Sequence, residues 1–67
     1  PPEPNPCEKS NKSCCIITSG PGQTAEQCVE KNNAAEQCGA IASRYPKFDS
    51  YPQVSVSSAT NVCRNAK

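Results

Sequence analysis

The sequence predicts a small disulfide-rich α+β fold, with one central helix or helix pair packed on a short two-stranded β-sheet and three disulfides. Three observations predict this class. The 67 residues include six cysteines, segment 24–45 has apolar residues at helical spacing, and segments 14–18 and 53–57 have the composition of strands. We therefore expect a single domain spanning residues 1–67.

The segment 24–45 is the longest stretch with helical periodicity. Thr24 follows a Gly-Pro-Gly turn and has a glutamine three residues on, which is the pattern of a capping box at a helix start. Asparagine competes with the helix backbone, so Asn33 offers an alternative in which it caps a second, shorter helix. The repeat of Ala-Glu-Gln-Cys at 25–28 and 35–38 favours this helix pair. The sequence leaves both alternatives open.

Two short segments are expected to form the sheet. Residues 14–18, Cys-Cys-Ile-Ile-Thr, are rich in β-formers and bounded by polar or turn-forming residues. Residues 53–57 alternate valine with polar side chains, which is typical of a half-buried strand. We expect the two strands to pair with each other and to carry the helix on one face.

The six cysteines compensate for a shortage of apolar side chains. The chain has no Trp, Met or His, one Phe and two Tyr, and so short a chain buries only about 60% of its unfolded surface. An even set of cysteines at irregular spacing predicts three disulfides, whereas a metal site would need histidines or a Cys-x-x-Cys pair. Disulfides indicate a secreted, extracellular protein, and we expect no metal and no cofactor. The six cysteines are Cys7, Cys14, Cys15, Cys28, Cys38 and Cys63.

Geometry narrows the pairing of the cysteines. Cys14 and Cys15 are adjacent on a strand and point to opposite faces, so each is expected to anchor a different element. In a continuous helix, Cys28 and Cys38 lie about 15 Å apart along the axis, too far for a bond. We therefore expect each helix cysteine to bond to one strand cysteine, and the first and last cysteines of the chain to bond to each other.

The N-terminal residues are expected to stay outside the packed domain. Residues 1–6, with four prolines, predict an extended Pro-rich arm. Residues 8–13 predict a polar loop, and within it Asn-Lys-Ser is a sequon that makes Asn11 a candidate glycosylation site. No leader segment and no apolar run of membrane-spanning length is evident, so we expect a mature secreted product without a transmembrane segment.

Segment 45–52 holds every aromatic residue of the chain and has Tyr-Pro at both ends. Prolines stiffen a loop, and exposed aromatic rings are frequent anchors at protein interfaces. The alternative is that the rings pack over the alanine-rich helix face and supply its missing bulk. The candidate binding residues are Tyr45, Lys47, Phe48 and Tyr51.

Composition argues against catalysis and against nucleic acid as a partner. Without histidine the commonest general base is missing, and oxidised cysteines are not nucleophiles. Glu26 and Glu30 would lie one turn apart on the helix, but acidic residues are ordinary near a helix start. The net charge of +1 comes from interspersed charges, which does not suit a nucleic-acid surface. We expect a protein that is not an enzyme and has no catalytic residues.

The chain resembles small cysteine-rich secreted proteins of fungi and oomycetes, including effectors that act on a host. The features that carry this resemblance are the Pro-rich start, the six cysteines and the tail Ser-Ser-Ala-Thr-Asn-Val-Cys. The resemblance implies an extracellular protein that acts by binding, as a virulence factor or toxin.

These observations favour a secreted, monomeric binding protein that acts on a host or partner protein as an effector, toxin or signal. One alternative is a protease inhibitor that presents loop 45–53 in a rigid, substrate-like form. A second alternative is an antimicrobial peptide, although the low net charge is a poor match for anionic membranes.

Overall fold

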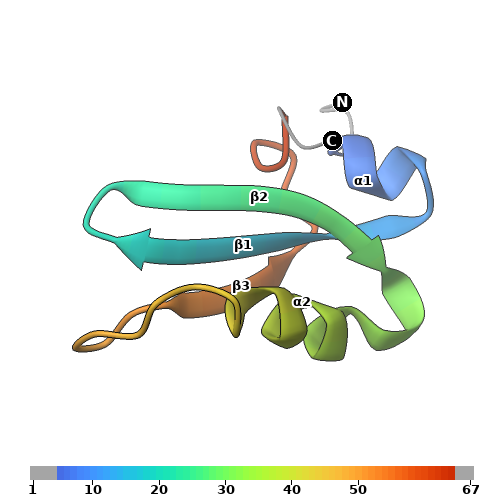
Figure 1. The fold of residues 1–67 in the computed structure, drawn as a ribbon. Coiled ribbons are helices and arrows are strands. Elements are labelled where there is room, and N and C mark those ends of the chain that lie inside the picture. The colour runs from blue at the N-terminus through green and yellow to red at the C-terminus, as the bar shows by residue number, and fades with distance from the viewer. Residues whose placement is uncertain (1–4, 65–67) are drawn as a thin grey trace.

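The computed structural model describes residues 5–64 and shows two helical elements packed on opposite faces of a three-stranded antiparallel sheet (Figure 1). The sheet order is β2-β1-β3, so β1 is central. This arrangement confirms the disulfide-rich α+β class. The elements are α1 (Pro6–Lys9), β1 (Lys12–Gly20), β2 (Gln23–Glu30), the 3-10 helix η1 (Lys31–Asn33), α2 (Ala34–Ala42) and β3 (Gln53–Ser57).

The helix expected over residues 24–45 is wrong in its first half, where the structure has a strand. β2 pairs antiparallel with β1 along its whole length and makes the expected two-stranded sheet three-stranded. The turn before it, with Gly22 at φ 70°, closes a hairpin instead of leading into a helix cap. A helix cap contributes only about 1 kcal/mol. β2 is an edge strand, so pairing with β1 satisfies the backbone groups of alternate residues along its eight-residue length, and these several hydrogen bonds outweigh a single cap.

The repeated tetrapeptide Ala-Glu-Gln-Cys adopts two different structures. Residues 25–28 lie in β2 and residues 35–38 lie in α2. Asn33 occupies the residue before α2, as the helix-pair alternative expected, but its side chain makes no capping hydrogen bond. The junction is held instead by Gln37, whose Oε1 accepts a hydrogen bond from the Glu30 backbone N–H at 2.8 Å. The two copies have the same intrinsic preference for helix or strand, so the tertiary packing of each copy decides which structure it adopts.

The strands expected over 14–18 and 53–57 are both present. The second coincides with β3, and the first is extended at both ends to form β1. As expected, β3 pairs with β1, with Val54 opposite Ile17 and Val56 opposite Cys15.

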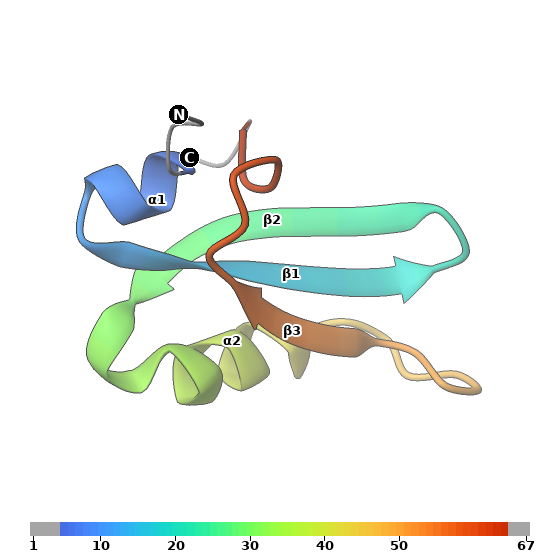
Figure 2. The ribbon, with the colours of Figure 1, turned by 180° about the vertical axis from the view of Figure 1, so that it is seen from behind.

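Cys14 and Cys15 divide the interior into two clusters, one on each face of β1, as their adjacency predicted. Figure 2 shows α2 on one side of the sheet, with α1 and the segment after β3 on the other. The cluster under α2 comprises Cys15, Ile17, Val29, Ala34, Cys38 and Ala42, with Ile41 and Tyr45 packed against it. The cluster on the opposite face comprises Cys7, Cys14 and Cys63, with Ile16, Cys28 and Val62 packed against it.

All six cysteines form disulfides, in the pairs Cys7–Cys28, Cys14–Cys63 and Cys15–Cys38. The expected bond between a strand cysteine and Cys38 is present. The expected pairing of Cys28 with a strand cysteine is wrong, as is the pairing of Cys7 with Cys63. The reason is that Cys28, on β2, faces the cluster opposite α2. α1 packs on this same face of the sheet and carries Cys7.

The N-terminal end of the described chain is packed, not extended. Asn5 is fully buried and caps α1, and Pro6 is the first residue of that helix. Any Pro-rich arm is therefore confined to residues 1–4, which lie outside the described residues. The polar loop expected over 8–13 is also wrong at both ends, because residues 8 and 9 belong to α1 and residues 12 and 13 belong to β1. Proline is well suited to the first helical position, because its missing N–H has no partner there in any helix.

Glu26 holds the segment after β3 against the sheet. Its Oε2 accepts a hydrogen bond from the Cys63 backbone N–H at 2.9 Å, and Cys63 adopts a φ of 58°. This positive φ is uncommon for a residue with a side chain, so the backbone conformation at Cys63 depends on the groups that bond to it. The Cys14–Cys63 disulfide and the Glu26 hydrogen bond together hold this turn.

Glu26→Ala is expected to lower the free energy of unfolding by about 1.5 kcal/mol, because the N–H of the buried residue Cys63 loses a charged acceptor. Glu26→Gln is the matched control, since its side-chain oxygen can still accept this bond, and it should cost less than half as much. Denaturant unfolding of both variants measures the difference. Equal losses for the two variants would show that the carboxylate does not act through this hydrogen bond.

Candidate functional site

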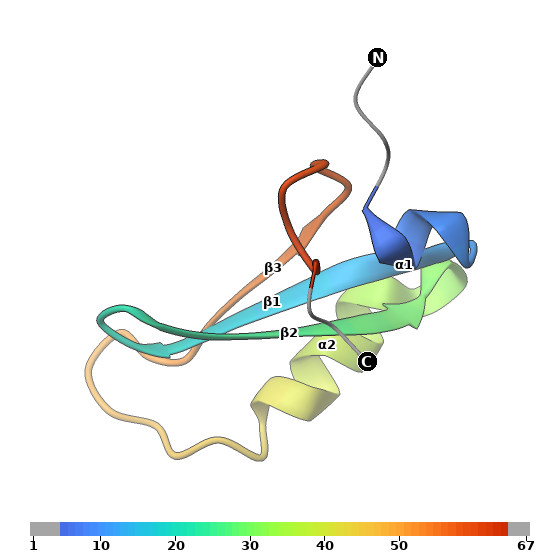
Figure 3. The same ribbon diagram turned by 90° about the horizontal axis from the view of Figure 1, so that it is seen from above.

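A groove of about 390 Å³ lies between the second half of α2, the loop 43–52 and the start of β3. Figure 3 shows this loop running from the end of α2 toward the end of the sheet where the β1–β2 turn also lies. The helix contributes only small residues to the groove, while the loop and β3 contribute the larger ones. The lining residues are Gly39, Ala42, Ser43, Lys47, Asp49, Ser50, Tyr51, Pro52 and Val54.

The small residues of α2 explain why the groove is open. An added Cβ at Gly39 would meet no atom within 4 Å, so this part of the helix surface faces free space. Ala42 is buried against the core, and its side chain is a single methyl group that does not fill the groove. A helix with larger side chains at these positions would fill the space between itself and β3.

The tip of the loop is a tight turn stabilised by its own backbone. Phe48 N–H donates to Tyr51 O at 3.2 Å, and Tyr51 N–H donates to Phe48 O at 3.0 Å. Asp49, inside the turn, has a φ of 54°, a conformation that aspartate tolerates better than most residues. The rings of Phe48 and Tyr51 have centroids 6.4 Å apart, and their planes are tilted by 57°. The peptide bond between Tyr51 and Pro52 is cis.

The four candidate binding residues have different environments. Lys47 and Tyr51 both line the groove, and the side chain of Phe48 is 52% exposed beside it. Tyr45 is half-buried and packs against the core cluster under α2. The rings therefore divide between the two roles considered from the sequence: Tyr45 adds bulk to the core, whereas Phe48 faces solvent.

Sequence reasoning did not identify the contribution of β3 to this surface. Val54 and Val56 are 43% and 42% exposed, although they share the sheet face of Cys15 and Ile17. Alternation with serine predicted that these valines would be half-buried. The missing information was the placement of α2, whose residues beside Val54 include Gly39 and Ala42 and are too small to cover the strand. Val54 belongs to the groove as well.

The carboxylate pair considered as a catalytic alternative does not lie on a helix. Glu26 and Glu30 both lie on β2, so their Cα atoms are about 13 Å apart at the rise of a strand, and not one helical turn apart. Glu26 is in addition the hydrogen-bond acceptor for Cys63.

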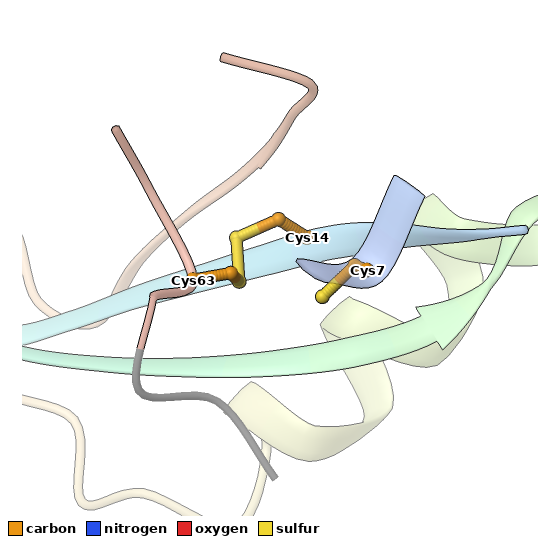
Figure 4. A group of neighbouring side chains, drawn as sticks. All are labelled: Cys7, Cys14 and Cys63. Atoms are coloured by element: carbon orange, nitrogen blue, oxygen red, sulfur yellow. A yellow bond between two sulfur atoms is a disulfide. The ribbon is translucent and has the colours of Figure 1, made fainter. Parts of the chain in front are cut away.

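The sulfur atoms of Cys7, Cys14 and Cys63 lie within 4.8 Å of one another (Figure 4). This spacing would suit three thiolates around a metal ion. Each of these sulfurs is already bonded to another sulfur, and a disulfide lacks the thiolate that binds a metal. The group is therefore a pair of adjacent disulfides on one face of β1.

Asn11, the candidate glycosylation site, lies in the turn between α1 and β1. Its side chain is exposed, and its φ of 59° is one that asparagine adopts more readily than most residues. The serine of the sequon, Ser13, is 8% exposed at the start of β1. Glycosylation of this asparagine stays a prediction.

The chain was compared with protein-family models, with curated proteins and with solved structures, and none of the three comparisons found a match. Within residues 5–64, no helix combines the length and the apolar character needed to cross a membrane.

Proposed function

We propose that this chain is a secreted binding protein without enzymatic activity, which engages a host or partner protein through the groove and the adjacent loop tip. The observation that carries the proposal is the meeting of an open groove with an exposed aromatic side chain. Phe48 stands beside a concavity whose wall includes Tyr51, and aromatic anchors next to pockets dominate many protein interfaces.

The scaffold supports this role because it holds the loop from both ends. The loop begins at α2, which is bonded to β1 through Cys15–Cys38, and it ends at β3, which is paired with β1. A preformed site loses less conformational entropy on binding than a loop that must be ordered. Three disulfides in a small domain are also compatible with an extracellular location. The resemblance to cysteine-rich effectors of fungi and oomycetes points to the same role.

A protease inhibitor is the second candidate, and the exposure of Lys47 and Phe48 favours it. Such inhibitors present an extended backbone that pairs with the protease. Here the backbone groups of Phe48 and Tyr51 are bonded to each other across a tight turn, which leaves them engaged within the loop. We therefore place binding of a partner protein first.

Two variants that change the groove in opposite ways are expected to weaken binding at least tenfold. Tyr51→Ala removes part of its wall, and interface aromatics commonly contribute 2 kcal/mol or more. Gly39→Leu fills the groove from the helix side, where there is room for a side chain, and it replaces a poor helix former by a good one. The measurement is affinity capture from an extracellular extract with immobilised native protein, followed by titration of the captured protein against each variant.

Asn61→Ala is the matched control, because Asn61 is exposed and directly precedes Val62 and Cys63, which belong to the cluster on the sheet face opposite α2. It should bind like the native chain. Loss of binding with the control, or full binding with Gly39→Leu, would show that the partner uses another surface. Incubation with serine and cysteine proteases tests the second candidate, which predicts slow cleavage after Lys47 together with inhibition.

A further inference from the structure

Two of the three disulfides lie side by side on the face of β1 that is covered by α1. Cys7 and Cys28 form one of them, and Cys14 and Cys63 form the other. The sulfurs of Cys7, Cys14 and Cys63 are within 4.8 Å of one another, and Figure 4 shows the Cys7 sulfur pointing toward the Cys14–Cys63 bond. We call these four residues the sulfur cluster.

We infer that the sulfur cluster is a thiol–disulfide exchange site, at which an external monothiol converts the chain into a second isomer with Cys7–Cys63 and Cys14–Cys28 bonds. The third disulfide, Cys15–Cys38, is on the opposite face of the sheet and is not exchanged. The inference is independent of the groove and of the proposed function.

The second isomer fits the backbone that is already present. Cys14 and Cys28 are directly opposite each other in the β1–β2 ladder. Opposite residues of an antiparallel pair have Cβ atoms about 4.5 to 5.5 Å apart, close to the roughly 3.5 to 4.5 Å of a disulfide. Cys7 and Cys63 need a sulfur movement of less than about 3 Å to reach bonding distance.

The burial of the four cysteines determines where exchange begins. Cys7, Cys14 and Cys63 are fully buried, whereas Cys28 is partly exposed. An external thiolate reaches a disulfide only at an accessible sulfur. Cys28 is the only residue of the sulfur cluster with partial exposure, so we assign the attack to its sulfur, with the buried Cys7 as the leaving group.

Exchange then proceeds in three displacements without net oxidation or reduction. The external thiolate attacks the Cys28 sulfur, forms a mixed disulfide there and releases Cys7 as a thiolate. The Cys7 thiolate attacks the Cys63 sulfur, breaks its bond to Cys14 and releases Cys14 as a thiolate. The Cys14 thiolate attacks the Cys28 sulfur of the mixed disulfide and returns the external thiolate. The monothiol is a catalyst, and the two isomers have the same mass.

Trypsin distinguishes the isomers, because Cys7 and Cys63 each fall in a fragment separate from the one that holds Cys14, Cys15 and Cys28. In the observed pairing, fragments 1–9, 32–44 and 48–64 are all linked to fragment 13–31. In the second isomer, fragment 1–9 is linked to fragment 48–64 and both separate from the other two. The experiment incubates the folded chain with reduced glutathione under argon, blocks thiols with N-ethylmaleimide and analyses an unreduced digest by mass spectrometry.

The expected result is the appearance of the linked pair of fragments 1–9 and 48–64, while fragments 13–31 and 32–44 stay joined. Failure of glutathione to attach to Cys28, or failure of the linked pair to appear once it has attached, would overturn the inference. Equal scrambling of all six cysteines would overturn it as well, because it would indicate global unfolding.

Two single variants provide an internal test that needs no added thiol. Cys28→Ser leaves Cys7 as a free thiol beside the Cys14–Cys63 bond, and Cys38→Ser leaves Cys15 as a free thiol on the other face of the sheet. The variant at Cys28 is expected to contain at least about tenfold more of the linked pair, because only its thiol is held next to a disulfide. Equal amounts in the two variants would contradict the exchange site.

Discussion

Replacing Cys15 and Cys38 together by alanine is expected to lower the free energy of unfolding by about 4 kcal/mol. The two residues are 23 apart in sequence, and closing a loop of that length contributes about 3 kcal/mol in the chain-entropy model. Both side chains are fully buried in the cluster under α2, so their truncation also leaves a small cavity that costs about 1 kcal/mol. A domain of this size has a total stability of only about 3 to 10 kcal/mol, so this substitution removes roughly two fifths of it or more.

Cys7→Ala with Cys28→Ala is the matched comparison. Its sequence separation of 21 makes the loop-closure contribution nearly the same. Cys28 is partly exposed, however, whereas Cys7 is fully buried, so about half as much packing is lost and the free energy of unfolding should fall by roughly 0.5 kcal/mol less. Urea unfolding followed by circular dichroism measures both variants. Equal losses of unfolding free energy in the two variants would mean that the Cys15–Cys38 disulfide stabilises the fold only through chain entropy.

Asn5→Ala is expected to lower the free energy of unfolding by about 2 to 3 kcal/mol, an unusually large loss for a residue near a chain end. The Asn5 side chain is fully buried and makes two hydrogen bonds. Its Oδ1 accepts from the Glu8 N–H at 2.9 Å and so caps α1, and its Nδ2 donates to the Ala59 carbonyl at 3.0 Å. Losing a helix cap costs about 1 kcal/mol and losing the hydrogen bond to the Ala59 carbonyl about 1 kcal/mol, and truncating a fully buried side chain adds the cost of a cavity.

Asn5→Ser separates the two hydrogen bonds. Serine is a good helix cap but is too short to reach the Ala59 carbonyl, so this variant should lose only the second contribution. Guanidinium unfolding should therefore place it between the native chain and Asn5→Ala. A serine variant as unstable as the alanine variant would show that capping of α1 contributes nothing. A native-like alanine variant would contradict both contributions.

Part of the candidate site could be predicted from the sequence. The aromatic rings and prolines of segment 45–52 were visible, and they led to Lys47, Phe48 and Tyr51. The groove itself was not visible, because it is a space between α2 and β3 and depends on the distance between two elements. Gly39 and Val54 have no distinguishing pattern in the sequence, and they join the site only through the position of β3 at the sheet edge.

Three features could be predicted from the amino-acid sequence: all six cysteines pair in a chain with too few apolar residues for an ordinary core, Cys14 and Cys15 serve opposite faces of one strand, and strands lie where β1 and β3 are found. These conclusions follow from side-chain chemistry and from the two-residue period of a strand, which are local properties. Contacts between distant segments determine that residues 23–30 are a strand and which cysteines bond to each other. The reason is that Ala-Glu-Gln-Cys tolerates both helix and strand, and the free energy of pairing with β1 exceeds the small local preference for a helix.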